Sequence, residues 1–211
     1  MHSAQPPRVP KVLDLDRNEF DATCKKLMEL VLTDWRPDVL IGIRSGGLYV
    51  AEAMGKACPF HIPIHSITCR RPTTRFKTAS ATLRGVIAEL PRPVLDQLRV
   101  LEHRLITQRA KHPKPGERQL DAAELEVLDH WLTTAGDHPS LLIVDDSVDS
   151  GVTMAIVRDA IRRRSPAGAE IRCATITVTT PQPSIIPDYV LFHQQLCRFP
   201  WSLDAQLNIS R

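Results

Sequence analysis

Four short runs of apolar residues, rich in β-branched side chains, constrain the fold of this chain more than any other feature. They cover residues 39–43, 141–144 and 171–178, with a more mixed run at residues 62–69. Unbroken apolar runs of this length predict strands that are buried on both faces of a sheet. Apolar residues at helical spacing lie between these runs, as at residues 48–57 and 152–164. Strands that alternate with helices predict an α/β fold, with a mostly parallel twisted sheet flanked by helices.

The size and composition of the chain suit a single globular domain. It has 211 residues, of which 43% are hydrophobic and 24% are charged, and these values argue against extensive disorder. No apolar run reaches the roughly 18 residues that a membrane-spanning helix needs. The first ten residues are polar and rich in proline, without the apolar stretch of a secretory signal. We therefore expect a flexible tail over residues 1–12 and one domain over residues 13–211.

The five cysteines are odd in number, widely spaced and contain no C-x-x-C pair. This spacing favours neither a disulfide framework nor a zinc cluster. We therefore expect reduced thiols in a cytoplasmic protein. The net charge of +3 fits a small anionic ligand as well as a nucleic acid, so the charge does not separate these two kinds of partner.

The segment at residues 141–153 reads LLIVDDSVDSGVT and carries the most specific chemistry in the chain. Its apolar strand runs directly into Asp145 and Asp146, and a Ser-Gly-Val-Thr turn over residues 150–153 then opens a helix. Backbone N–H groups at a helix N-terminus, joined by two hydroxyls, favour an anion such as phosphate. Carboxylates only accept hydrogen bonds, so an adjacent pair suits the vicinal hydroxyls of a sugar and, through these, a divalent metal. A phosphate beside a diol indicates a ribose 5-phosphate site.

This segment closely resembles the phosphoribosyl pyrophosphate (PRPP) signature of type I phosphoribosyltransferases. In that signature an apolar strand leads into two acids, two or three spacers and a T/S-G-x-T phosphate loop. A P-loop does not fit, because no G-K-[ST] follows the glycine. A response-regulator receiver does not fit either, because its paired acids lie near the start of its domain, whereas only 58 residues follow Thr153 here.

The resemblance implies the type I phosphoribosyltransferase fold and transfer of the 5-phosphoribosyl group from PRPP to a purine-like or other heterocyclic base, with release of pyrophosphate. It implies that Asp145 and Asp146 hold the ribose hydroxyls and, through these or through water, a Mg²⁺ ion. Asp149 lies between these acids and the phosphate turn, so we expect its carboxylate to reach the attacking base as general acid/base. The residues expected to bind the 5-phosphate are Ser150, Gly151, Val152 and Thr153.

The strand at residues 39–43 ends in a second turn, Arg44-Ser45-Gly46-Gly47. This turn resembles the pyrophosphate loop of the xanthine/guanine phosphoribosyltransferases, which implies a cis peptide bond at Arg44–Ser45 and N–H groups aimed at pyrophosphate. Those relatives read S-R-G-G, so the arginine here is displaced by one position. The resemblance therefore leaves open whether the Arg44 side chain or the backbone alone binds pyrophosphate.

The C-terminal part resembles the last core strand and the base-selecting hood of the same enzymes. The resemblance rests on residues 174–181, 187–190 and 198–201, and it places the hood over about residues 181–211. Thr179 stands where purine-specific relatives have a lysine that reads the 6-oxo group, and Leu196 or Phe199 stands in for their stacking aromatic residue. We expect these three residues to bind the base, and the departures leave the identity of the base open.

Residues 70–118 contain twelve arginines and lysines but only four acids. The loop that begins this segment is either a flexible lid over the pyrophosphate or a solvated basic loop without a role. A helical insertion is expected over about residues 85–138, and Asp121-Ala-Ala-Glu124 within it predicts a capping box at a helix start. The loop residues concerned are Arg70, Arg71, Arg75 and Lys77.

A second class of function stays open for the basic segment. Some proteins with this fold sense PRPP and act as regulators that bind nucleic acid without catalysis. An enzyme is the stronger interpretation, because the sequence shows no helix-turn-helix module and retains Asp149. A PRPP synthase-like kinase does not fit, because the chain lacks an ATP site and has half the required length. As partners, the resemblance implies PRPP, a base and other copies of the chain in a homodimer or homotetramer, with no membrane and no nucleic acid.

Overall fold

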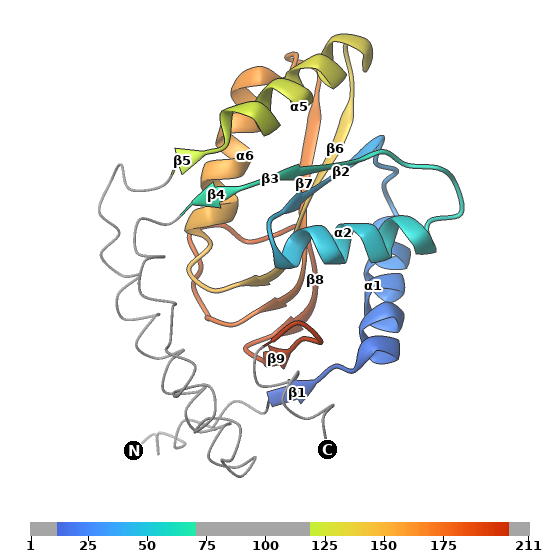
Figure 1. Cartoon of the computed structure of the whole chain (residues 1–211), viewed down its shortest axis with the longest axis vertical. Coiled ribbons are helices and arrows are strands. Elements are labelled where there is room, and N and C mark those ends of the chain that lie inside the picture. Colours follow the sequence, from blue (N-terminus) through green and yellow to red (C-terminus); the bar gives the residue numbers. More distant parts are fainter. Residues whose placement is uncertain (1–11, 71–118, 203–211) are drawn as a thin grey trace, which may run out of the picture.

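The computed structural model describes residues 12–70 and 119–202 (Figure 1). Most of the expected tail, the lid residues Arg71, Arg75 and Lys77, and residues 85–118 of the expected insertion lie outside the described residues. The helices are α1 (Arg17–Val31), α2 (Gly46–Ala57), α5 (Ala122–Thr134) and α6 (Val152–Arg164). The strands are β1 (Val12–Asp14), β2 (Val39–Ile43), β3 (Ile64–Ile67), β4 (Cys69–Arg70), β5 (Gln119–Leu120), β6 (Ser140–Val148), β7 (Glu170–Val178), β8 (Tyr189–His193) and β9 (Leu196–Arg198).

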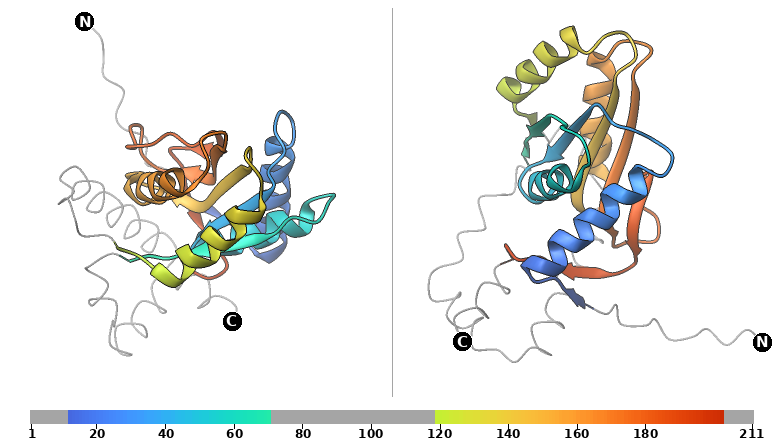
Figure 2. Two further views of the ribbon diagram at one scale, coloured as in Figure 1. Left: turned by 90° about the horizontal axis from the view of Figure 1, so that it is seen from above. Right: turned by 90° about the vertical axis from the view of Figure 1, so that its right-hand side faces the viewer.

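The central sheet has five parallel strands in the order β3-β2-β6-β7-β8. Successive side chains on a strand point to opposite faces, so on β2 Leu40 packs in one core while Val39 and Ile41 pack in another. Helices α1 and α2 cover the first face, and α5 and α6 cover the second (Figures 1 and 2). Burial on both faces explains the unbroken apolar runs, and the predicted α/β fold with a parallel sheet is confirmed.

Two short strand pairs lie outside the central sheet. Strand β1 pairs in parallel with β9, which ties the start of the described chain to its end. Strand β4 pairs antiparallel with β5, at the two ends of the segment 71–118. Sequence patterns do not predict these pairs, because strands of two or three residues are too short to show a period of their own.

Two element boundaries differ from the sequence-based expectation, and both lie where site residues were expected. Strand β6 continues past Val144, because Asp145, Ser147 and Val148 keep pairing with β7. Helix α2 begins at Gly46, two residues earlier than its apolar pattern indicates. The predicted carboxylates therefore lie on the end of a long strand, and the predicted glycines form the first turn of a helix.

Two of the cysteines are deeply buried. None of the five cysteines, all of which lie in the described ranges, forms a disulfide bond. Burial raises the pKa of the Cys24 thiol and raises that of Cys173 to about 12. These two buried thiols therefore stay protonated at neutral pH. Within residues 12–70 and 119–202, no helix is long and apolar enough to cross a membrane.

Candidate functional site

The predicted site residues gather where three neighbouring strands end. Strands β2, β6 and β7 are parallel neighbours, so their carboxyl ends lie at the same edge of the sheet. The Arg44–Ser45 turn follows β2, and two threonines follow Val178 at the end of β7. Asp145 and Asp146 lie among the last residues of β6, and Asp149 comes directly after this strand. Ligands of open parallel sheets bind at this kind of edge.

The turn after β2 has the expected backbone. The peptide bond between Arg44 and Ser45 is cis, which confirms the prediction. A Cβ atom on Gly46 would lie 2.0 Å from Oδ2 of Asp146, and one on Gly47 would lie 2.4 Å from the carbonyl oxygen of Val144. Only glycine fits at position 47, because the turn packs directly against the backbone of β6, whereas a side chain at position 46 would displace the Asp146 carboxylate.

The Arg44 side chain is directed toward helix α5. Its Nε lies 2.9 Å from Oε1 of Glu124 and donates a hydrogen bond of 3.0 Å to the hydroxyl of Ser66. Glu124 also accepts hydrogen bonds from the backbone N–H of Thr68, from its hydroxyl (3.2 Å) and from the Ser66 hydroxyl (3.1 Å). One carboxylate thus holds the Arg44–Ser45 turn, β3 and the residue before β4 together.

Sequence reasoning assigned Glu124 only to a capping box, and that box is half formed. The Asp121 side chain accepts hydrogen bonds from the N–H groups of Ala123 and Glu124. In a complete capping box the Asp121 N–H would also donate to the Glu124 carboxylate. At this described helix start the Asp121 N–H donates to the carbonyl of Thr68 instead. The Glu124 carboxylate is therefore used to dock α5 against the strands, and only the fold reveals this second use.

The predicted diol-binding acids are half-buried at the end of β6. Oδ1 of Asp145 accepts a hydrogen bond from the Asp146 N–H (3.0 Å), and Oδ1 of Asp146 accepts one from the Ser147 N–H (2.8 Å). Burial raises the pKa of Asp146, and the charge of Asp149 adds to the rise, while hydrogen bonds of its carboxyl with the Asp145 side chain and with the N–H groups of Ser147 and of Asp146 itself offset part of it. An ionised Asp146 is therefore costly without a ligand and would gain from hydroxyl donors.

Asp149 is held by the segment that follows β7. Its Oδ1 accepts a hydrogen bond of 2.6 Å from the Thr179 hydroxyl, and its backbone carbonyl accepts one of 2.8 Å from the Thr180 hydroxyl. The next carbonyl, of Ser150, accepts from both the N–H and the hydroxyl of Ser184, each at 2.8 Å. The predicted acid/base and the predicted base-binding Thr179 are thus in direct contact.

The phosphate turn requires its glycine. Gly151 has φ +76°, and a Cβ atom there would lie 2.9 Å from the backbone nitrogen of Ile185. Both the left-handed backbone and the close contact exclude other residues. Gly151 is also the N-cap of α6, so this helix starts without a side-chain cap.

The helices that begin at this edge differ from the other described helices in how they start. Helix α1 has a complete capping box from Asp16 and Glu19, and α5 has the Asp121 cap with Glu124 in its first turn. Among the described residues, neither α2 nor α6 has a side-chain cap hydrogen bond, and neither has an acid in its first turn. The partial positive charge of these two N-termini is not neutralised by their own residues, which favours binding of an anion.

The hood places the other predicted base-binding residues in the core. Leu196 and Phe199 are 6% and 4% exposed, and the Phe199 ring stacks on Trp201 with centroids 5.0 Å apart. Trp201 also contacts Phe20 of α1 and the half-exposed Tyr49 of α2, each at 4.9 Å between centroids. The structure thus brings Thr179 to Asp149, whereas Leu196 is buried and Phe199 packs against the helix layer.

Comparison with known proteins rests on structure, because no protein-family model matches the sequence and no curated protein matches it significantly. A purine phosphoribosyltransferase from Pyrococcus horikoshii is 19% identical with a TM-score of 0.55, and the match covers 90% of this chain and 94% of that one. A xanthine-guanine-hypoxanthine phosphoribosyltransferase from Helicobacter pylori is 13% identical with a TM-score of 0.58, covering 95% and 100%. This chain has the type I phosphoribosyltransferase fold. A hypothetical protein from Neisseria gonorrhoeae with bound ppGpp also matches, at 14% identity, a TM-score of 0.54 and coverage of 96% and 98%.

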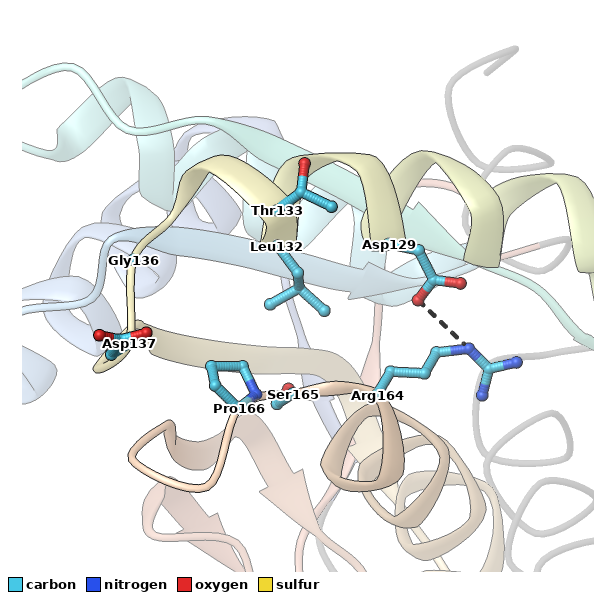
Figure 3. Close-up of a pocket in the computed structure, with 8 residues that line it drawn as sticks. All are labelled: Asp129, Leu132, Thr133, Gly136, Asp137, Arg164, Ser165 and Pro166. Carbon is cyan, nitrogen blue, oxygen red and sulfur yellow. Dashed lines mark ion pairs between the residues drawn. The ribbon is translucent and has the colours of Figure 1, made fainter.

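One pocket of this phosphoribosyltransferase fold lies away from the predicted site residues. It has a volume of about 510 Å³ and lies between the C-terminal parts of α5 and α6 (Figure 3). Arg164 and Asp129, 3.3 Å apart, form an ion pair on its wall. Helix α6 begins at the carboxyl end of the sheet and ends here, so the pocket lies toward the amino ends of the strands. None of the predicted site residues lines it.

Proposed function

We propose that this protein is a PRPP-dependent phosphoribosyltransferase that transfers the 5-phosphoribosyl group to a nitrogenous heterocyclic base and releases pyrophosphate. The observation that carries the proposal is the packing of the cis-peptide turn against the end of β6, where the Asp146 carboxylate would contact a Cβ atom on Gly46. This contact brings the pair of carboxylates against the N-terminus of α2, and α6, which also lacks a cap and a first-turn acid of its own, begins a few residues after them. Such an arrangement suits a ligand with phosphoryl groups at both ends of a sugar diol.

The proposed roles follow the chemistry of each group. Asp145 and Asp146 accept hydrogen bonds from the ribose hydroxyls, and the turn at residues 150–153 binds the 5-phosphate. The N–H groups at residues 45–47 face the pyrophosphate. The Arg44 guanidinium is engaged by Glu124, so the backbone, rather than this side chain, is the main pyrophosphate ligand in the turn.

The proposed reaction is a substitution at C1 of the ribose. The bond from C1 to a pyrophosphate oxygen breaks and its electrons leave with pyrophosphate, while a ring nitrogen of the base forms the new C–N bond. The proton that the base loses moves to Asp149. The transition state resembles an oxocarbenium ion, so fixed charges and exclusion of water supply most of the rate acceleration.

A Mg²⁺ ion belongs to this proposal, and the donor set fits an indirect role for the protein. No group of three or more His, Cys, Asp or Glu side chains that could hold a metal comes together in the described ranges. A Mg²⁺ ion that accompanies PRPP would therefore take most of its ligands from substrate oxygens and water. Asp145 and Asp146 would hold it through ribose hydroxyls or water, and the ion would neutralise charge on the leaving pyrophosphate.

The experiment that tests the proposal is a screen of purines, pyrimidines and less common heterocycles with PRPP and Mg²⁺. Pyrophosphate release and the mass of the nucleotide product are the two measurements. We expect at least one base to give both signals, and the doubly substituted variant Asp145→Asn/Asp146→Asn to give neither. Pyrophosphate release without a nucleotide product, or from the double variant, would contradict the proposal.

A regulator that binds nucleic acid and senses PRPP or a related nucleotide is the second candidate. Twelve arginines and lysines against four acids in residues 70–118 favour it, and the structural neighbour from Neisseria gonorrhoeae carries ppGpp. Such binding weakens steeply with salt. Filter binding to RNA and DNA at two salt concentrations, with and without PRPP or ppGpp, tests this candidate. A regulator should bind RNA or DNA more tightly at low salt, whereas the proposed enzyme should bind neither.

The proposal also covers the compartment and the oligomeric state of the protein. Five cysteines that form no disulfide bond within the described ranges fit a reducing compartment, so we place the protein in the cytoplasm. A homodimer or homotetramer is the proposed assembly, and light scattering of the purified protein measures it.

A further inference from the structure

The Thr179 hydroxyl donates its one proton to the protein. Its Oγ1 lies 2.6 Å from Oδ1 of Asp149 and 3.5 Å from the carbonyl oxygen of Val148. Both partners can only accept hydrogen bonds when Asp149 is ionised, and a hydroxyl has one proton to donate. Whichever partner receives that proton, only the lone pairs of the Thr179 oxygen remain for a ligand.

The neighbouring hydroxyls have the same direction. Thr180 donates to the carbonyl of Asp149, and Ser184 donates to the carbonyl of Ser150, each at 2.8 Å. Three hydroxyls of the segment after β7 thus give their protons to the loop at residues 148–150. The sequence also places no lysine or arginine between Cys173 and Cys197. This side of the site therefore offers hydrogen-bond acceptors and no fixed cation of its own.

Because these hydroxyls already donate their protons to the protein, they can only accept hydrogen bonds from the base, and this favours a base with a donor group beside Asp149. In the proposed function Asp149 takes the proton of a ring nitrogen, and Thr179 is one hydrogen bond away from the same carboxylate. The ring substituent next to that nitrogen therefore faces the Thr179 oxygen. An amino substituent would donate to it, whereas an oxo substituent would bring two acceptors together and leave both unpaired.

We propose that the acceptor base carries an exocyclic amino group beside the ring nitrogen that faces Asp149, so that the site prefers amino-substituted heterocycles, of the 6-aminopurine kind, to their oxo counterparts. This inference rests on the proposed function and names the substrate class of the same site. Thr179 is its specificity-determining residue.

The test uses matched bases that differ in the amino and oxo groups, namely adenine with hypoxanthine and 2,6-diaminopurine with guanine. For each pair, kcat/KM is measured by pyrophosphate release with PRPP and Mg²⁺. We expect the wild-type protein to prefer the amino member of at least one pair about tenfold or more, the usual effect of one unpaired polar group. Preference for the oxo member in every active pair overturns the inference and leaves the proposed function intact.

Variants at position 179 separate selection from general damage. Thr179→Ser keeps the oxygen acceptor and should keep the preference, whereas Thr179→Val has nearly the same shape and should bring the ratio close to one. Thr179→Lys has only donors and should favour the oxo member. The ratio within a pair cancels any loss of turnover that all bases share. An unchanged ratio in Thr179→Val would overturn the role of this residue.

A binding measurement keeps the inference testable if no base reacts. Calorimetry with AMP and IMP compares an amino and an oxo product without catalysis. Tighter binding of AMP to wild type and Thr179→Ser, lost in Thr179→Val, would support the inference even where the failure to release pyrophosphate contradicts the proposed enzyme. Equal or tighter binding of IMP to the wild-type protein would overturn it.

Discussion

Three aspartates within five positions of the chain have different surroundings in the folded protein. Asp146 packs against the first turn of α2, while Asp149 accepts a hydrogen bond from Thr179. Asp145 uses one carboxylate oxygen to accept the N–H of its neighbour. Because their partners differ, substitutions at these positions should have effects that experiments can tell apart.

Replacement of the proposed acid/base tests its role directly. Asp149→Asn keeps the size of the side chain and an oxygen that accepts the Thr179 hydrogen bond, but it cannot take a proton. We expect kcat to fall by about 10²- to 10⁴-fold, the usual value of a positioned proton acceptor. PRPP affinity, measured by calorimetry, should change little. Full turnover in this variant would show that Asp149 only braces the phosphate turn.

The raised pKa of Asp146 predicts how stability depends on pH. Burial makes the folded pKa higher than the unfolded one, so the penalty is absent in acid, where the group is neutral in both states. The penalty develops as pH rises through the folded pKa. Asp146→Asn should therefore match the wild-type Tm near pH 3 and exceed it near pH 8, while it loses PRPP binding.

Thermal unfolding across this pH range measures the Asp146 effect. Asp137→Asn is the matched control, because Asp137 is exposed near the amino ends of the strands. A Tm of Asp146→Asn below that of the wild type at neutral pH would mean that the carboxylate has a stabilising partner in the free protein.

At the scale of secondary structure, the Glu124 side chain links helix α5 to the residues of the site. Glu124 accepts hydrogen bonds from Thr68 and Ser66 and pairs with Arg44. The Glu124 side chain is 19% exposed, whereas that of Arg44 is 51% exposed. The hydrogen bonds from the strands therefore contribute more to stability than the ion pair does, since water screens an exposed charge.

Substitution of Glu124 should loosen this attachment. Glu124→Ala leaves the Thr68 N–H without its acceptor and should lower the free energy of unfolding by about 1–3 kcal/mol. Glu124→Gln keeps an acceptor oxygen and should lose less. Urea denaturation measures both variants, with Glu126→Ala on the exposed side of the same helix as control. We also expect a higher KM for PRPP in Glu124→Ala, and equal effects of the Ala and Gln variants would contradict this account.

At the scale of the whole molecule, the hood is secured by the N-terminal segment. The buried Arg198, 4% exposed, pairs with Asp14, and its carbonyl accepts a hydrogen bond of 2.9 Å from the Leu15 N–H. Thr177 of β7 adds a hydrogen bond of 2.7 Å to the carbonyl of Gln195. The segment at residues 195–198, which belongs to the expected hood, is thus held from two sides.

Weakening the β1–β9 connection should lower the stability of the protein and raise its KM for the base. Asp14→Asn removes the charge that faces Arg198, and we expect a loss of about 1 kcal/mol of stability, because Asp14 is half-exposed. Steady-state kinetics should show a higher KM for the base, with the KM for PRPP unchanged. Asp21→Asn on the exposed side of α1 is the control. An increase confined to the KM for PRPP would contradict this separation of the two ends.

The sequence by itself determined the layers of the fold and the residues of the phosphate and diol motif. Residues 39–43 and 141–144 are apolar throughout because helices cover both faces of the sheet. Such an unbroken apolar run can be recognised from the local sequence alone. The Ser-Gly-x-Thr turn was likewise predictable, because it depends on a few adjacent residues. For the same reason, boundaries set by pairing with another strand, as at the end of β6, were missed. The cis peptide at Arg44–Ser45 was implied by the resemblance of its turn to the pyrophosphate loop of the xanthine/guanine phosphoribosyltransferases.

Only the tertiary structure decided which partner each side chain takes. Arg44 meets Glu124, Asp149 meets Thr179, and Phe199 turns into the core beside Phe20. The residues of each pair lie at least 30 positions apart in the chain, and no local periodicity encodes such a contact. Their positions follow from the order of the strands and the packing of the helices, because these bring distant segments to the same edge of the sheet.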